Sequence, residues 1–284
     1  MKWRGRRGSR NIEDRRGRRV GGGAALGGVG GLGLLVVVIG WFFGVDLTPL
    51  LQDGAVAPDR SSGGPITEAD RQAGEFVSVT LADTEEVWSD IFARQVGEPY
   101  RPITLVLFTG VTQSPCGGAS GATGPFYCPV DRKAYLDTAF FTTLSRQLGA
   151  SGDFAAAYVV AHEVAHHVQN ELGILGQANR IRAQSSTERS NQISVRLELQ
   201  ADCLSGVWAA AARDRFGSIE PGDIAEAMNA AARIGDDTLQ RGAGRVPRPE
   251  TFTHGTSEQR QSWFATGYET GDITACDTFS AERL

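Results

Sequence analysis

The residues that could do chemistry in this chain gather in one short segment, His162-Glu163-Val164-Ala165-His166. The chain has only four histidines among its 284 residues, and three of them fall between His162 and His167. On a helix, His162 and His166 lie one turn apart on the same face, so both imidazoles can reach one ion. Zinc suits imidazole ligands well. The spacing therefore predicts a zinc site, with one zinc ion per chain.

The glutamate of this segment has a different predicted role from the histidines. Glu163 points about 100° away from His162 around the helix, which places it poorly for binding the same ion. It can still reach a water molecule beside the metal, which is the position of a general base. We therefore predict that Glu163 is a catalytic residue that acts on this water.

A catalytic zinc ion needs a third protein ligand and one open position. The metzincin signature would place a histidine at position 172, where this chain has Leu172. Glu198 is the better candidate, because the segment Glu198-Leu-Gln-Ala-Asp202 places its two acids on one helix face, as in gluzincins. Asp202 would then accept a hydrogen bond from a ligand imidazole and orient it. His254 and Glu171 are the alternative ligands, and Glu198 and Asp202 could also simply solvate a helix.

The two remaining histidines lead to separate predictions. His167 neighbours a ligand but faces about 100° away from it, which favours a structural role. His254 is the only histidine outside residues 162–167, and it precedes a helix for which Thr256 and Gln259 can form a capping box. We consider His254 a candidate donor to the oxyanion of the transition state, with an ordinary surface role as the alternative.

The hydrophobic pattern predicts the elements that must position these residues. A short β-branched run, Ile103–Thr109, predicts a central strand, and Lys133–Leu136 is a weaker candidate. An early helix would open at Asp83, with Glu86 as its capping-box partner. Four later helices are expected over residues 154–172, 194–216, 223–233 and 257–266.

The first 20 residues differ in charge from the rest of the chain. They hold nine lysines and arginines against two acids, a net charge of +7, whereas the remaining residues hold 19 against 31, a net charge of −12. An acidic main domain argues against nucleic-acid binding, which needs basic surface. No charged residue occurs from Val20 to Val45, which is long enough for a membrane helix. The alternative is a signal peptide cleaved near Ala55-Val56-Ala57.

These features predict the domain organisation. By the positive-inside rule, the N-terminus would be cytoplasmic and the catalytic domain extracytoplasmic, on a single-pass anchor in the cell membrane. The predicted segments are a basic cytoplasmic tail (1–20), a transmembrane signal anchor (21–45), a flexible linker (46–66) and a metallopeptidase domain (67–284).

The four cysteines are consistent with an exported domain. Outside the cytoplasm they are expected to form disulfides, and the absence of a Cys-x-x-Cys motif disfavours a structural zinc ribbon. Three pairings are possible. We favour Cys116–Cys128, which closes a local glycine-rich loop, together with Cys203–Cys276.

Several longer segments resemble one known family. They are MKWRGRRGSRNIEDRRG at the start, CGGASGATGPFYCP, AHEVAHHVQ, RLELQADCLSGVW, FTHGTSEQR and the CDTF around Cys276. Over nearly its full length the chain is similar to the bacterial, membrane-anchored, predicted neutral zinc metallopeptidases. One difference is Ala165, where that family would have glycine, and a methyl group should be tolerated there.

The resemblance implies an α+β, zincin-like fold in which a small sheet packs on the HExxH helix and on a second, glutamate-bearing helix. It implies His162, His166 and Glu198 as zinc ligands and Glu163 as the catalyst. By analogy with zincins, an extended substrate would pair with an edge strand near Lys133–Asp137.

Two other classes of function compete with a peptidase that acts on extracytoplasmic proteins or peptides. One is a catalytically silent envelope scaffold that binds zinc, against which the presence of Glu163 argues. The other is a membrane-tethered, partner-binding protein that uses its arginine-rich tail, although membrane topology and anionic lipid already explain that tail. The expected partners are thus a peptide or protein substrate and membrane lipid. The sequence indicates no oligomeric state.

Overall fold

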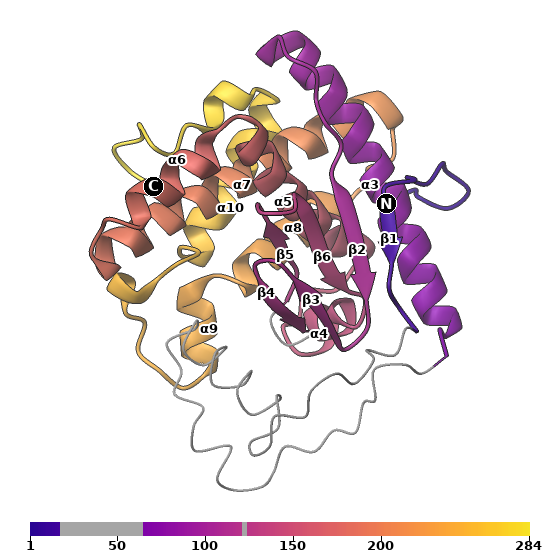
Figure 1. The fold of residues 1–284 in the computed structure, drawn as a ribbon, viewed down its shortest axis with the longest axis horizontal. Coiled ribbons are helices and arrows are strands. Elements are labelled where there is room, and N and C mark those ends of the chain that lie inside the picture. The colour runs from indigo at the N-terminus through magenta and orange to yellow at the C-terminus, as the bar shows by residue number, and fades with distance from the viewer. Residues whose placement is uncertain (18–64, 121–123) are drawn as a thin grey trace, which may run out of the picture.

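The computed structural model describes residues 1–17, 65–120 and 124–284. These residues form an α+β fold in which helices pack around a small sheet (Figure 1). The strands are β1 (Ile12–Asp14), β2 (Thr104–Phe108), β3 (Val111–Ser114), β4 (Gly117–Ser120), β5 (Phe126–Cys128) and β6 (Lys133–Asp137). The helices are α3 (Glu68–Ile91), α4 (Phe140–Arg146), α5 (Asp153–Glu171), α6 (Ile174–Arg182), α7 (Thr187–Phe216), α8 (Asp223–Arg233), α9 (Asp236–Gly242) and α10 (Ser257–Thr270).

The main sheet has the order β1-β2-β6-β5, and β3 and β4 form a separate hairpin. The strand β2 pairs in parallel with β1 and β6, whereas β5 pairs antiparallel with β6. The predicted strands at β2 and β6 are confirmed, but the prediction that Lys133–Asp137 is an edge strand is wrong. In the described residues β5 ends the sheet instead. A strand of only three residues after a glycine-rich loop carries too little periodicity to be found in the sequence.

The helix α5 lies at the centre of the core. Nearly every side chain from Phe154 to Gln169 is buried, because α5 packs between the sheet on one side and α7 and α8 on the other. The helices α7 and α10 approach each other so closely that a Cβ atom at Gly267 would lie 1.8 Å from the carbonyl oxygen of Cys203. Small residues therefore allow this contact, which fixes α10 against the helix that bears Glu198.

Most of the predicted helices are present, with shifted ends. The four predicted later helices correspond to α5, α7, α8 and α10, although α7 begins at Thr187 rather than Ser194. The predicted helix start at Asp83 is wrong. The helix α3 begins at Glu68 with a capping box between Thr67 and Asp70, and Asp83 is buried in its middle. A buried acid is possible there because a distant arginine neutralises it, and sequence periodicity contains no sign of that partner.

The described part of the predicted basic tail, residues 1–17, packs against the rest of the fold. The strand β1 extends the sheet beside β2, as Figure 1 shows. The guanidinium of Arg6 donates to both carboxylate oxygens of Asp83 at 2.5 and 2.7 Å. Lys133 donates to Glu13 at 2.6 Å, and the α-amino group of Met1 contacts the Asp153 carboxylate at 2.9 Å.

The predicted membrane anchor, residues 21–45, lies outside the described residues. Among the residues that are described, no helix is both long and apolar enough to cross a membrane.

Both favoured disulfides are confirmed. Cys116 is bonded to Cys128 beside the β3–β4 hairpin, and Cys203 on α7 is bonded to Cys276 after α10. The second bond joins parts of the chain that are 73 residues apart, so it adds a covalent tie to the contact between α7 and α10.

A charge exchange tests whether the tail packs on the domain in solution. We expect Arg6→Glu to lower the free energy of unfolding by roughly 3 kcal/mol, because it leaves the buried Asp83 beside a like charge. The double variant Arg6→Glu/Asp83→Arg should recover part of this loss in urea unfolding. The exposed Arg7–Glu86 pair provides a matched control, since Arg7→Glu should change stability little. Equal effects of Arg6→Glu and Arg7→Glu would contradict the packing of the tail.

The pH dependence of stability provides a second test of the same packing. Hydrogen bonds from Arg15 and Lys133 lower the pKa of Glu13 to about 2 from its ordinary value of 4.5. A carboxyl group with a lowered pKa stabilises the fold above pH 4.5 and loses that contribution as pH falls from 4.5 toward 2. Because Glu13 is one-third exposed, we expect about 0.5–1 kcal/mol. Unfolding curves of the parent and Glu13→Gln should therefore differ at pH 7 and converge only as the pH approaches 2.

Candidate metal centre

The structure brings His162, His166 and Glu198 together. The helix α5 presents the two imidazoles one turn apart, with ring centroids 4.8 Å apart and planes almost perpendicular. The helix α7 crosses α5 and supplies Glu198, whose carboxylate oxygens lie 3.0 Å from His162 Nε2 and 3.5 Å from His166 Nε2. One potential ligand atom from each residue lies within 4.8 Å of the others, so the three atoms can surround a single ion.

The donor set fits zinc. Each imidazole uses its other nitrogen to contact an acceptor, since His162 Nδ1 lies 2.9 Å from Asp202 Oδ1 and His166 Nδ1 lies 2.9 Å from Gln169 Oε1. These contacts favour a proton on Nδ1 and leave Nε2 as the ligand atom. Two imidazoles and a carboxylate, each oriented in this way, form the donor set of a catalytic zinc site.

Gln169 is a positioning residue that the sequence analysis did not identify. It is fully buried, and its amide nitrogen donates to the Leu197 carbonyl at 2.7 Å and to Gln200 Oε1 at 3.1 Å. These two bonds set the orientation of the amide, so that its oxygen faces His166. The available signal was its position three residues after His166, on the same helix face.

Charge balance in the centre also favours a cation. Burial acts to lower the pKa of His162, but Asp202 and Glu198 outweigh it and raise this pKa to about 10. Burial would raise the pKa of Glu198, but His166, His162 and, more weakly, His254 hold it well below its usual range. The two carboxylates thus favour positive charge between them, which a divalent cation supplies.

Glu163 lies beside this group but outside it. Only 8% of the residue is exposed, and within the described part of the chain its Oε2 is buried without a hydrogen-bond partner. Burial raises the pKa of Glu163, against the opposing influence of His166 and His162. A buried carboxylate oxygen without a partner is uncommon, and it marks a place where water or a substrate group can bind.

His254 is held by a carboxylate that the sequence analysis missed. Asp236, the first residue of α9, contacts His254 Nδ1 at 3.2 Å through Oδ1. Its Oδ2 accepts the backbone N–H groups of Thr253, His254 and Gly255 at 2.8, 2.6 and 3.0 Å. No motif connects Asp236 with His254, because the two residues are 18 positions apart in the sequence, across a short helix and a loop.

The structure does not place the other candidates in the centre. Glu171 pairs with Arg132, and His254 pairs with Asp236, so neither joins His162 and His166 as a third ligand. His167 is buried, with Nδ1 3.1 Å from the Tyr127 hydroxyl and Nε2 2.7 Å from the Arg101 carbonyl. It thus links α5 to the sheet, as a structural histidine does.

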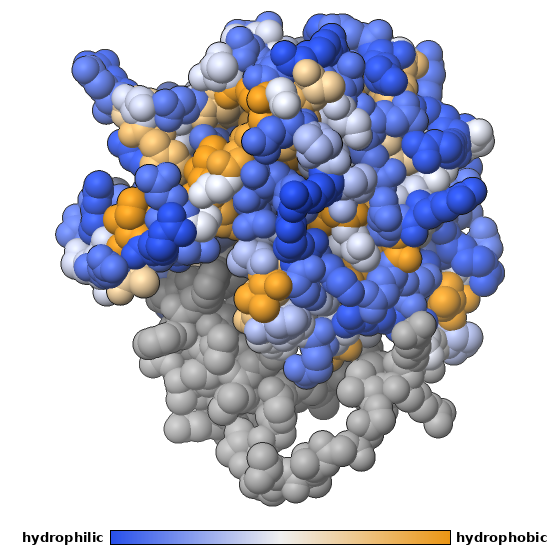
Figure 2. Space-filling model, turned by 45° about the horizontal axis from the view of Figure 1, so that its top comes forward, coloured by the Kyte–Doolittle hydropathy of each residue, from blue (hydrophilic) through white to orange (hydrophobic). Residues whose placement is uncertain are grey.

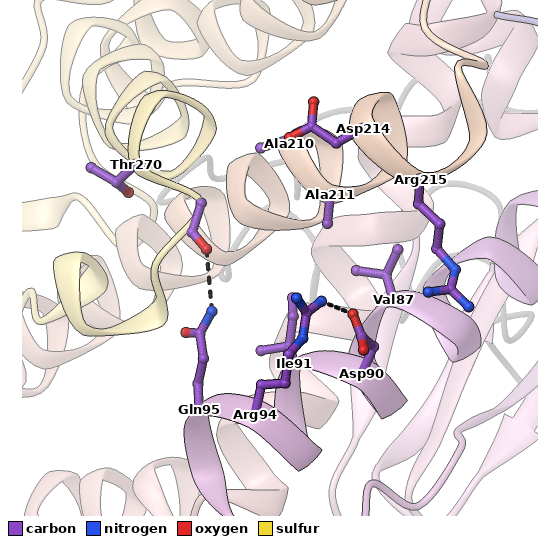
Figure 3. Close-up of a pocket in the computed structure, with 11 residues that line it drawn as sticks. Val87, Asp90, Ile91, Arg94, Gln95, Ala210, Ala211, Asp214, Arg215 and Thr270 are labelled. Atoms are coloured by element: carbon purple, nitrogen blue, oxygen red, sulfur yellow. Dashed lines mark hydrogen bonds and ion pairs between the residues drawn. The ribbon is translucent and has the colours of Figure 1, made fainter.

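A cavity of about 510 Å³ lies away from the metal centre. Figure 3 shows that its lining comes from the end of α3, the segment after it and the last turns of α7 and α10, and the predicted site residues do not contribute to it. Its polar contacts are an Asp90–Arg94 ion pair and a hydrogen bond from Gln95 to the Gly271 carbonyl. The wider surface in Figure 2 is mostly hydrophilic, with apolar residues exposed in patches.

The chain is similar to a known protein family over nearly its whole length. Residues 1–279 match the family described as "Putative neutral zinc metallopeptidase". The chain belongs to this family. The resemblance found in the sequence is therefore confirmed, and the His–His–Glu group lies within the matched residues.

Two relatives of this chain are both described as uncharacterized. A protein of Escherichia coli strain K12, "Uncharacterized protein YpfJ", is 44% identical over 289 residues that cover 98% of this chain and 99% of the relative. "Uncharacterized protein Rv2575" of Mycobacterium tuberculosis is 44% identical over 250 residues, which cover 83% of this chain and 81% of its own. No solved structure matches the chain.

Zinc retention tests the assignment of ligands. We expect one zinc per chain, and His162→Ala, His166→Ala and Glu198→Ala should each greatly weaken its retention during dialysis against a chelator. Glu171→Ala serves as the control, because it removes the rejected third ligand and should keep the zinc. Loss of zinc from Glu171→Ala but not from Glu198→Ala would overturn this assignment.

Proposed function

We propose that this protein is a zinc metallopeptidase that hydrolyses peptide bonds in proteins or peptides. The single observation that carries the proposal is the buried, unpartnered carboxylate oxygen of Glu163 next to a His–His–Glu group. A purely structural zinc site needs only ligands, whereas a hydrolytic site also needs a base beside an open position. Membership of a zinc metallopeptidase family supports the same activity.

Each residue of the site has a defined role in this mechanism. His162, His166 and Glu198 would hold the zinc ion, which polarises the scissile carbonyl and makes a neighbouring water more acidic. Glu163 takes a proton from the attacking water and delivers it to the leaving amine. Its raised pKa suits this exchange, because a carboxyl group that titrates nearer neutral pH accepts and returns a proton more readily.

We assign His254 to the developing oxyanion. Its side chain is 23% exposed, and it helps to lower the pKa of Glu198, which supports a position at the margin of the metal centre. With Nδ1 in contact with Asp236, Nε2 is the ring nitrogen that we assign to a hydrogen bond with substrate. Asp236 would orient the ring.

The substrate would bind in an extended conformation along β5. This strand ends the sheet in the described residues, and its Tyr127 hydroxyl contacts His167 on α5, so β5 lies against the helix that carries the metal ligands. A peptide that pairs with an edge strand gains backbone hydrogen bonds regardless of its sequence. This proposal replaces the expected pairing with Lys133–Asp137, which lies inside the sheet.

The two disulfides support a location outside the cytoplasm for the folded part of the chain, residues 1–17 included. Attachment to a membrane through residues 21–45 remains our proposal from their uncharged, apolar composition. A silent zinc-binding scaffold is the second candidate function, but nothing in such a role requires the buried carboxylate of Glu163.

Replacement of the base separates an enzyme from a scaffold. We expect Glu163→Gln to keep its zinc and its thermal stability but to lose peptide hydrolysis by about 10²–10⁴-fold, because an amide cannot accept the proton. Zinc content, melting temperature and cleavage of a broad peptide library should be measured together. His254→Ala should lower turnover less than Glu163→Gln. Cleavage by Glu163→Gln at the parental rate would reject this mechanism, and a parent that cleaves nothing would favour the scaffold.

A further inference from the structure

A buried arginine lies directly behind the metal centre. Arg260, on α10, is 2% exposed, and none of the roles assigned above includes it. Its Nε donates to Asp202 Oδ2 at 2.8 Å and its Nη2 donates to Asp202 Oδ1 at 3.0 Å. These two parallel bonds are the bidentate arrangement in which the planar guanidinium binds a carboxylate most specifically.

The carboxylate of Asp202 accepts hydrogen bonds from two other helices, α5 and α10. Its Oδ1 also accepts hydrogen bonds from the Tyr158 hydroxyl and from His162 Nδ1, both on α5. Arg260 Nη2 lies 3.2 Å from the Tyr158 hydroxyl, so the side chains close a ring around the carboxylate. A chain of contacts therefore runs from α10 through Asp202 on α7 to the ligand imidazole on α5.

Arg260 contributes both charge and geometry to this chain. Asp202 is fully buried, and an ionised carboxylate at such a depth is stable only beside an opposite charge with its oxygens hydrogen-bonded. The guanidinium supplies that charge permanently, because it does not lose its proton in proteins. Its planar fork also fixes the plane of the carboxylate, so that Oδ1 faces His162 Nδ1. Without the fork the carboxylate could rotate away from the imidazole.

The position of Arg260 is itself rigid. It lies in the first turn of α10, after the capping box of Thr256 and Gln259, and its Nη1 donates to the Ile234 carbonyl at 3.2 Å. The close contact of Gly206 and Gly267 prevents α10 from sliding along α7, since a Cβ atom at Gly206 would lie 2.1 Å from the Phe264 carbonyl oxygen. Precise placement of the guanidinium thus follows from the packing of two helix backbones.

We propose that Arg260, assisted by Tyr158, is a positioning residue of the metal centre that acts through Asp202 to hold His162 with Nε2 directed to the zinc ion. This inference rests on the proposed function, because it requires a metal at His162, His166 and Glu198. It extends that function to a residue 58 positions away from Asp202 in the sequence. The role explains why a charged side chain is completely enclosed at this point.

Zinc affinity of the purified, full-length chain tests the proposal without any peptide substrate. Competition with a chromophoric chelator should show that Arg260→Met weakens zinc binding about 10–100-fold, the range for loss of an outer partner of a ligand. Arg260→Lys keeps the charge but not the fork, and it should lie between the parent and Arg260→Met. Arg16→Met is the matched control, since it removes another arginine, whose side chain is 7% exposed and whose carboxylate partner is Asp14 rather than Asp202.

A double variant distinguishes positioning through Asp202 from a general structural effect. Because Arg260 acts through Asp202, Arg260→Met should weaken zinc binding less than threefold further when Asp202 is already asparagine. The ¹⁵N chemical shifts of His162 in the zinc-loaded chain should report a protonated Nδ1 in the parent and a weaker hydrogen bond to the carboxylate in Arg260→Lys. This second readout keeps the test informative if Arg260→Met does not fold.

The outcomes separate failure of this inference from failure of the proposed function. Parental zinc affinity in both Arg260 variants, or effects of Arg260→Met and Asp202→Asn that multiply independently, would overturn the role of Arg260 alone. A parent chain that binds no zinc would reject the metal centre and this inference together. A parent that binds zinc but cleaves no peptide would reject only the peptidase activity.

Discussion

The buried carboxylate of Asp202 sets the conditions that the rest of the structure must meet. A charge in the protein interior costs several kcal/mol unless donors surround it, and here they come from α5 and α10 while Asp202 itself belongs to α7. Three helices must therefore pack in one specific arrangement before the charge is satisfied. Once they do, the same carboxylate orients His162, so the stability of the core and the geometry of the metal centre share one interaction.

The helix α5 carries both metal ligands and the base of the proposed site, on different sides of the helix. Helical geometry places His162 and His166 on the face toward Glu198, and it rotates Glu163 by about 100° from His162. Asp202 and Gln169 form hydrogen bonds with the two ligand imidazoles. In contrast, Oε2 of Glu163 has no hydrogen-bond partner among the described residues. Hydrolysis requires ligands held in a fixed orientation and a base that is free to bind a water molecule.

The basic tail shows how charge can serve the fold rather than a membrane or a nucleic acid. Arg6 neutralises Asp83 inside α3, and Glu13 joins Arg15 and Lys133 at the edge of the sheet. Part of the positive charge in the first residues therefore offsets negative charge in the acidic domain. Composition alone could not show this, because it gives the net charge of a segment but not the ion-pair partners of its side chains.

Local patterns in the sequence were enough to predict several elements. The HExxH spacing, the E-x-x-x-D spacing and the apolar runs each report a helix or strand through neighbours three, four or two positions apart, and those predictions correspond to α5, α7 and β2. The side chains that complete the site become apparent only when the helices are packed together. Gln169, Asp236 and Arg260 act through partners brought near by helix packing, and β5 is an edge because of strand order. Such contacts depend on distances between segments, which local spacing does not encode.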